Sequence, residues 1–120
     1  MGKISSVKQS YLFSRAYKYG KCVATAHVVV YALKKKKASE NATTGLGLTV
    51  AKKYGNAVKR SRARRIMREA YRQLSDRLSG GYVIIAVARH ALATAKTQDV
   101  YADMVYAFKK LGILKAEETK

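Results

Sequence analysis

A chain of 120 residues, 48% of them hydrophobic, is long enough to fold as one domain around a modest core. Its 25 basic and 7 acidic residues give a formal net charge of +18, which favours nucleic acid as the partner over an anionic membrane surface or an acidic protein. The single cysteine, Cys22, excludes an intrachain disulfide and a cysteine-based metal cluster.

The first elements that the sequence predicts are a helix and a β-rich stretch. Residues 10–19 are expected to form a helix, with Ser10 as its N-cap and Gly20 as a left-handed residue after its end. Residues 22–33 contain the run HVVVYAL, in which β-branched and aromatic side chains are dense. Because such residues fit a pleated, half-buried surface, this stretch is expected to supply strands.

A polar break separates these strands from the middle of the chain. The segment 34–44, KKKKASENATT, is expected to be an exposed loop. Residues 45–51, GLGLTVA, alternate apolar with small or polar residues, which predicts a strand with one buried face. A long helix then begins after the N-cap residue Asn56 and is expected to reach about Leu78.

The last third of the chain predicts a buried strand and a helix. Residues 82–88, YVIIAVA, are a nearly continuous apolar run and read as a strand covered on both faces. A final helix opens at Thr97 or Asp99 and is closed by Gly112, and the tail 115–120 is expected to be flexible. The whole chain is thus predicted to be one α+β sandwich with about four strands and helices on at least one face.

The predicted long helix has two chemically different sides. At about 100° per residue its apolar residues share one broad face, namely Ala63, Ile66, Met67, Ala70, Tyr71, Leu74 and Leu78. Ser61, Arg65, Arg68 and Arg72 line the opposite face, with few acids to balance them. Since the arginine fork donates paired hydrogen bonds to phosphate oxygens, this face is expected to bind a polyanion.

The sequence of this helix resembles that of a known protein family. Residues 55–72, GNAVKRSRARRIMREAYR, are similar to the signature segment of the bacterial ribonuclease P protein subunit, with its Gly-Asn-Ala-Val start, Arg-Asn-Arg centre and Arg-Glu/Gln-Ala-aromatic end. The segments LGLTVAKKYG, LFSRAYKYGK and YVIIAVAR resemble other parts of the family pattern, so the likeness covers nearly the entire chain. Ser61 departs from the pattern, because the family usually has Asn between the two arginines.

The resemblance implies a fold and a function. The fold would be an αβββαβα sandwich with a left-handed βαβ crossover, like the second domain of ribosomal protein S5. The protein would assist a catalytic RNA that removes the 5′ leader from precursor tRNA, and would bind both RNAs, with one protein per catalytic RNA. The RNA would supply the catalytic groups and require Mg²⁺, so no catalytic residue, metal ligand or cofactor is expected in the protein.

The resemblance also implies two sets of RNA-contacting residues. One set would bind RNA with the long helix and the turn before it: Lys52, Lys53, Asn56, Lys59, Arg60, Ser61, Arg62, Arg64, Arg65, Arg68 and Arg72. The other set, Phe13, Tyr17 and Tyr31, would line a cleft for the leader and stack on its unpaired bases. The opposing interpretation is that these three rings belong to the core.

Other functions find less support in the residues. The seven acids are scattered, and only Asp99 and Asp103 lie one helical turn apart, which makes a weak metal site and disfavours a protein-only nuclease. His27 and His90 have no metal ligands at suitable spacing. A structural RNA-binding protein, such as a ribosomal protein, fits the charge equally well, and only the exposed aromatic set would separate the two.

The sequence also bears on location. No stretch approaches the ~18 apolar residues of a membrane span. Lys3, Lys8 and Gln9 interrupt the apolar run that a signal peptide would need. The basic tract in the long helix is amphipathic, which disfavours a nuclear-localisation signal. We therefore expect a cytoplasmic protein.

Overall fold

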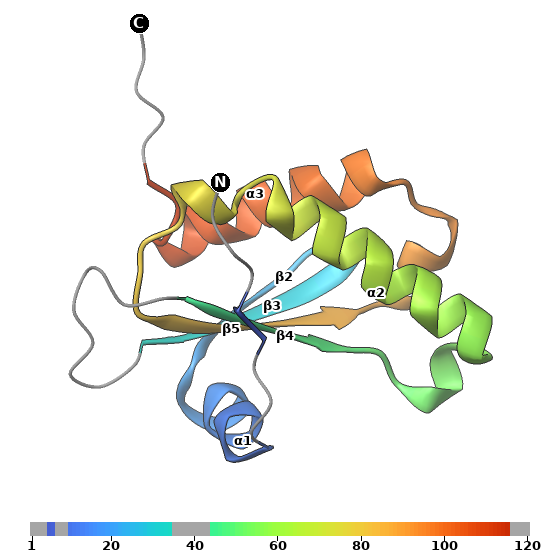
Figure 1. The fold of residues 1–120 in the computed structure, drawn as a ribbon, viewed down its shortest axis with the longest axis horizontal. Helices are drawn as coiled ribbons and strands as arrows, with labels where there is room; N and C mark the ends of the chain where they lie inside the picture. Colours follow the sequence, from blue (N-terminus) through green and yellow to red (C-terminus); the bar gives the residue numbers. More distant parts are fainter. Residues whose placement is uncertain (1–4, 7–9, 35–43, 116–120) are drawn as a thin grey trace, which may run out of the picture.

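The computed structural model describes residues 5–6, 10–34 and 44–115, and the side chains before residue 15 are outside this description. One helix covers one face of a central sheet and two helices cover the other (Figure 1). The helices are α1 (Ser10–Tyr19), α2 (Ala57–Arg72) and α3 (Thr97–Leu111), with short 3-10 turns η1 (Lys52–Tyr54), η2 (Ser75–Arg77) and η3 (His90–Thr94). The expected loop and tail lie almost entirely outside the described residues.

The sheet is mixed, with the strand order β1-β4-β5-β3-β2. Its strands are β1 (Ser5–Ser6), β2 (Lys21–Ala24), β3 (Val28–Lys34), β4 (Gly45–Thr49) and β5 (Tyr82–Ala88). β4 and β5 are parallel neighbours joined through α2, whereas β5, β3 and β2 pair antiparallel. The predicted α+β fold with four main strands is confirmed. The two-residue β1 adds an edge that the sequence did not indicate.

Alternation along the strands divides the core between the two faces of the sheet. Val30 pairs with Ala86 and points to the side of α2 and α3, where the larger buried cluster lies. On the other face Val83 and Ile85 pack with Ala16 of α1. Because β5 is central and covered on both faces, four consecutive residues of it are buried, as predicted from its continuous apolar run.

The long helix is shorter than predicted. Asn56 caps α2 as expected, but the helix ends at Arg72, and residues 75–77 form the η2 turn. The Ser75 hydroxyl donates to the Arg72 carbonyl, which is the kind of local side-chain bond that competes with helix continuation. Leu78 then forms a bridge with Leu114. The predicted end at Leu78 was wrong because apolar spacing continued into residues that are buried without being helical.

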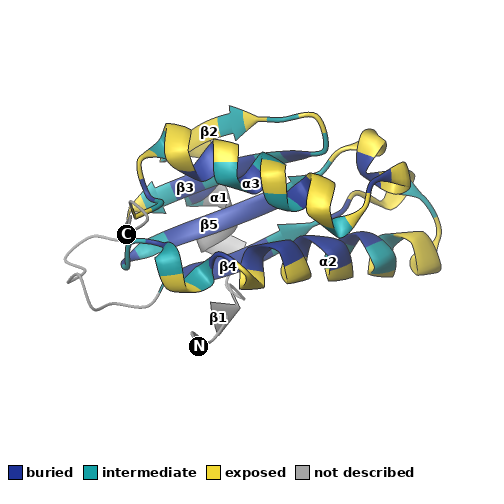
Figure 2. Cartoon of the chain, turned by 90° about the horizontal axis from the view of Figure 1, so that it is seen from above, coloured by how far each residue is buried: buried dark blue, intermediate teal, exposed yellow. Residues whose placement is uncertain are grey.

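The predicted apolar face is buried as expected, although Leu74 and Leu78 lie beyond the end of α2. All seven predicted residues are buried, and Figure 2 shows α2 buried along one side and exposed along the other. Tyr71 meets Phe108 of α3 edge-on at 6.2 Å between ring centroids. Burial raises the pKa of Tyr71 to about 12, since the phenolate would lose its hydration.

Gly20 and Gly112 end helices for different reasons. Gly112 follows α3 in the left-handed conformation, with a φ of 76°, as predicted. The same prediction for Gly20 was wrong, because Gly81 and Gly112 are the described glycines with positive φ. A Cβ at Gly20 would instead lie 2.5 Å from the carbonyl oxygen of Ala16 and 2.8 Å from that of Ala32. Glycine is therefore required there by close backbone contact.

Smaller boundary differences concern the strands and α3. The stretch 22–33 is a hairpin of β2 and β3, closed by Thr25, whose hydroxyl donates to the Val28 carbonyl at 2.7 Å. β4 ends at Thr49, two residues earlier than expected. α3 begins at Thr97, and the Asp99 carboxylate accepts from the Lys96 N–H at 2.9 Å. Among the described residues, no helix is long and apolar enough to cross a membrane.

Candidate nucleic-acid interface

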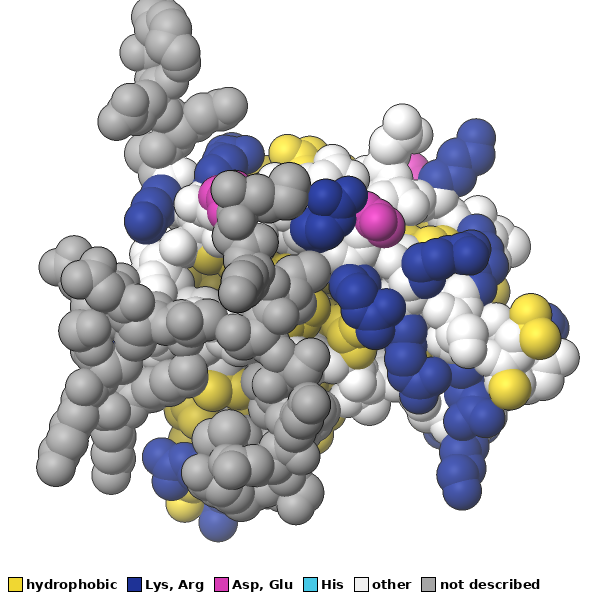
Figure 3. Space-filling model, in the orientation of Figure 1, with side chains coloured by type: hydrophobic (Ala, Val, Ile, Leu, Met, Phe, Trp, Pro, Cys, Tyr) yellow, Lys and Arg dark blue, Asp and Glu magenta, His cyan; other side chains and the backbone are white. Residues whose placement is uncertain are grey.

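A row of cationic side chains follows α2 on the outer surface of the molecule (Figure 3). The helix starts with Asn56, whose side-chain oxygen accepts from the Lys59 N–H at 2.9 Å. Ser61, Arg65 and Arg68 are exposed on one side of the helix, and we call these three residues the arginine face. Lys59 is exposed as well, on another side of the helix. Lys52 and Lys53 are exposed on η1, just before the helix. The structure thus brings the predicted basic residues of both segments to one region.

Arg62 is directed inward and does not belong to the arginine face. Its Nη1 donates to the carbonyl of Ala93 at 3.1 Å, and its Nη2 donates to that of Ala95 at 2.8 Å. These bonds tie α2 to the end of η3, and the side chain is half-buried. A guanidinium that holds two backbone carbonyls has fewer N–H groups left for phosphate.

Other predicted contact residues also have partners within the protein. Arg72 forms an ion pair with Glu69, with Nη2 and Oε1 2.6 Å apart. Asn56 uses its side-chain oxygen in the helix cap. Arg60 and Arg64 are half-buried, whereas Arg65 and Arg68 project into solvent. The predicted RNA-contacting residues therefore fall into two groups: some are half-buried or bound to other residues of the protein, and others have exposed charged groups.

Tyr17 and Tyr31 meet on the opposite face of the sheet, and we call them the tyrosine pair. Their rings lie edge to face with centroids 4.8 Å apart. The hydroxyls of Tyr17 and Thr49 share a hydrogen bond of 3.1 Å. Tyr17 is 42% exposed, so its ring is at the surface and not in the core. The predicted proximity of these two residues is confirmed, while the side chain of Phe13 lies outside the described residues.

Tyr31 has an electrostatic environment of its own. It is half-buried on β3 opposite Cys22 of β2. Loss of hydration raises the pKa of the Tyr31 phenol, and the neighbouring Cys22 thiol adds to this effect.

Carboxylates that could hold a metal ion are engaged in structural contacts. Asp103 accepts from the backbone N–H of His27 at 3.0 Å, and its Oδ2 lies 2.7 Å from His27 Nδ1. Asp99 caps the start of α3. In the described ranges no group of three or more His, Cys, Asp or Glu residues converges on a point. The pair Asp99 and Asp103 is thus explained by helix capping and by fastening the β2–β3 turn to α3.

Sequence reasoning missed a pocket at the end of the sheet where β4 and β5 finish. His90, for which the sequence indicated only the absence of metal ligands at suitable spacing, lies there against Tyr54, with nearly parallel rings and centroids 6.0 Å apart. Lys53 and Arg89 also line this pocket. No sequence pattern joins these residues, because they come from separate segments that converge only when the chain folds.

Comparison with known proteins gives consistent results. The Ribonuclease P family matches residues 1–112 of the chain. A ribonuclease P protein component from Bacillus cereus (strain B4264) is 33% identical over 113 residues, covering 94% of this chain and 96% of that protein. Its counterpart from Clostridioides difficile (strain 630) is 33% identical over 112 residues, with coverages of 92% and 95%. The structure of the Staphylococcus aureus RNase P protein superimposes with a TM-score of 0.80 at 28% identity, covering 94% of this chain and 100% of that one.

Proposed function

The chain belongs to the ribonuclease P protein family, and from this premise we propose that it binds a catalytic RNA and the 5′ leader of precursor tRNA. Binding both would promote endonucleolytic removal of the leader, with one protein acting per catalytic RNA. The observation that carries the proposal is the presence of two different RNA-compatible surfaces on opposite faces of one sheet. One surface is cationic and the other is aromatic.

The arginine face is suited to the folded catalytic RNA. Arg65 and Arg68 are exposed on the same side of a rigid helix, so their guanidinium groups can reach neighbouring phosphates. Glu69, the only acid on α2, is paired with Arg72 and leaves the exposed cations uncompensated. Phosphate contacts of this kind supply affinity and orientation without reading base sequence.

The tyrosine pair is suited to the leader, which is single-stranded. A partly exposed ring held at a fixed angle offers a surface on which an unpaired base can stack, at roughly 1–3 kcal/mol per base. Thr49 fixes the Tyr17 hydroxyl, and Tyr31 supports the ring from the sheet. A protein that only neutralised phosphates would have no use for an exposed pair of this kind.

In this proposal the RNA supplies the chemistry of cleavage. Asp99, Asp103 and Glu69 are occupied by a helix cap, a histidine and an arginine respectively. In this proposal magnesium ions would be bound by the RNA, where they could activate the attacking water. The protein contributes by holding the leader and the catalytic RNA together, which raises the fraction of substrate bound in a productive geometry.

Reconstitution with the cognate catalytic RNA at low magnesium tests this function. Addition of the protein is expected to increase cleavage of precursor tRNA, and Arg65→Ala or Arg68→Ala to reduce that gain. Lys109→Ala, which removes an exposed lysine from the last turn of α3, serves as the matched control and is expected to retain the gain. No increase in cleavage with wild-type protein would refute the proposal in favour of a structural RNA-binding role.

A further inference from the structure

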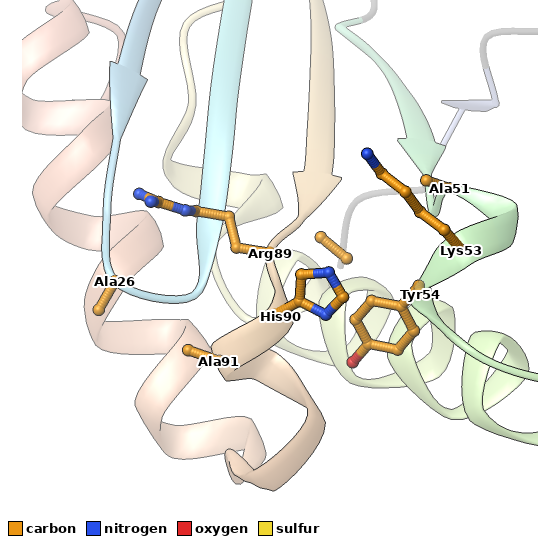
Figure 4. Close-up of a pocket in the computed structure, with 8 residues that line it drawn as sticks. Ala26, Ala51, Lys53, Tyr54, Arg89, His90 and Ala91 are labelled. Atoms are coloured by element: carbon orange, nitrogen blue, oxygen red, sulfur yellow. The ribbon is translucent and has the colours of Figure 1, made fainter.

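The pocket at the end of the sheet is built from three segments that are distant in sequence (Figure 4). It has a volume of about 360 Å³. Ala51, Lys53 and Tyr54 come from the connection between β4 and α2, residues 88–91 come from the end of β5 and the start of η3, and Ala26 comes from the β2–β3 turn. Half of the lining residues are alanines, so the space lies between the larger side chains. We call this the His90 pocket.

One wall of the His90 pocket is aromatic. The rings of His90 and Tyr54 are inclined by only 11°, with centroids 6.0 Å apart, and Figure 4 shows them side by side. His90 is exposed, whereas Tyr54 is half-buried. The exposed imidazole is therefore held beside a nearly parallel second ring, and its exposed surface is available for a nucleobase to stack on.

The other walls of the pocket carry positive charge. Lys53 and Arg89 are both exposed and extend on different sides of the space. Arg89 is held in place because its Nη1 donates to the carbonyl of Thr25 at 2.7 Å. No carboxylate is present among the described residues that line the pocket. An anionic group bound beside the His90 ring would thus meet two cations and no opposing charge.

Arg62 connects α2 to η3, the element that carries His90. Its hydrogen bonds to the carbonyls of Ala93 and Ala95 fasten η3 to α2. Since η3 begins with His90, and Tyr54 precedes α2 by three residues, the same contact holds the two rings at a fixed distance. The aromatic wall is consequently preorganised, and little conformational entropy would be lost when a ligand binds.

The pocket also lies between the two surfaces described above. Thr49, which bonds to Tyr17, stands two residues before Ala51 and pairs with Val87, one residue before Ala88. On its other side, η1 leads directly into α2 and the arginine face. The pocket thus occupies the end of the sheet, where an RNA strand could pass from one face to the other.

We propose that the His90 pocket binds one unpaired nucleotide of the precursor tRNA leader, with its base stacked on His90 and its phosphate held by Lys53 and Arg89. This inference rests on the proposed function and adds a third contact to it. The bound nucleotide would lie between the arginine face and the tyrosine pair. A bulged nucleotide of the catalytic RNA has the same chemistry and is the competing source.

The test measures equilibrium binding of precursor tRNA to the reconstituted complex, with and without the leader. His90→Ala is expected to weaken binding of the leader-bearing substrate by about 5- to 160-fold, which corresponds to the loss of one stacked base at roughly 1–3 kcal/mol. Binding of leaderless tRNA should not change. His90→Phe, which keeps an aromatic ring, should retain most of the affinity, whereas Ala51→Leu, which fills the pocket, should reproduce the loss.

Substrates that lack a single leader base identify the nucleotide. At one position the abasic substrate should bind weakly to the wild type and no more weakly to His90→Ala, since the same contact is already gone. Equal weakening of leader-bearing and leaderless tRNA would assign the pocket to the catalytic RNA and overturn the inference. Unchanged binding by both His90→Ala and Ala51→Leu, with leader dependence intact in the wild type, would overturn it while leaving the proposed function standing. If the wild type itself shows no leader dependence, the function and the inference fail together.

Discussion

Replacement of Arg62 is expected to lower stability more than RNA affinity, although a basic helix would suggest the reverse. Its guanidinium donates two hydrogen bonds to backbone carbonyls at the end of η3. A hydrogen bond from a charged group contributes roughly 1.5–3 kcal/mol when buried. Because Arg62 is half-buried, solvent weakens both bonds, so we assign each about 1 kcal/mol and expect Arg62→Ala to cost about 2 kcal/mol of unfolding free energy for the two bonds together.

Arg65→Ala should show the opposite behaviour. Arg65 is exposed, so its replacement is expected to change stability by less than about 0.5 kcal/mol. Loss of one phosphate contact should reduce the slope of log affinity against log salt by roughly 0.7–0.9. Urea unfolding and RNA binding at several salt concentrations measure the two quantities on the same proteins.

Arg62→Lys is the control that separates charge from geometry. Lysine keeps the positive charge but cannot bridge two carbonyls as the planar guanidinium does. We therefore expect Arg62→Lys to be destabilised like Arg62→Ala and to keep the wild-type salt slope. A structural role for Arg62 would be refuted if Arg62→Ala unfolded at the same urea concentration as the wild type while its salt slope fell by roughly 0.7–0.9, the value expected for one lost phosphate contact.

Three further changes test individual structural features. Asn56→Ala removes the side-chain cap of α2 and is expected to cost about 1 kcal/mol in urea unfolding; an unchanged midpoint would argue against the cap. Gly20→Ala places a Cβ against the carbonyls of Ala16 and Ala32 and should destabilise by about 1–3 kcal/mol, so a neutral result would mean that α1 does not approach β3 as described. In the folded state the pKa of Tyr71 is about 12, whereas in the unfolded chain it is near 10. The contribution of the protonated phenol to stability is therefore complete below pH 10 and declines as the pH rises towards 12. Relative to Tyr71→Phe, the wild type should therefore lose about 1.4 kcal/mol more between pH 8 and pH 11, and parallel pH profiles would contradict the burial of this phenol.

The spacing of apolar residues typical of helices and the apolar runs typical of strands predicted most of the fold. The run at residues 82–88 became the central strand, and the predicted apolar face of α2 is buried, because both patterns report contact with a core. The end of α2 was predicted too late because Leu74 and Leu78 continue the apolar spacing of the helix. Both side chains are buried, but Leu74 lies in the turn after the helix and Leu78 forms a β-bridge with Leu114. Gly20 was misread because its close contact with Ala32 depends on tertiary structure.

The candidate site was predicted less completely than the fold. The charge pattern placed Arg65 and Arg68 on an exposed face, which the structure confirms. It could not distinguish Arg62, whose carbonyl partners lie 31 and 33 residues away in the chain. The tyrosine pair came from the family resemblance, since spacing alone does not show that Tyr17 of α1 meets Tyr31 of β3. His90 had no sequence pattern at all to join it to Tyr54.

The central claim is that this protein makes binding of precursor tRNA depend on the leader. The most direct measurement is the affinity of the catalytic RNA for precursor tRNA and for the same tRNA without its leader, each with and without the protein. We expect the protein to tighten binding of the leader-bearing substrate more than that of the leaderless one, and we expect Tyr17→Ala to reduce the difference. An equal gain for both substrates would contradict this claim.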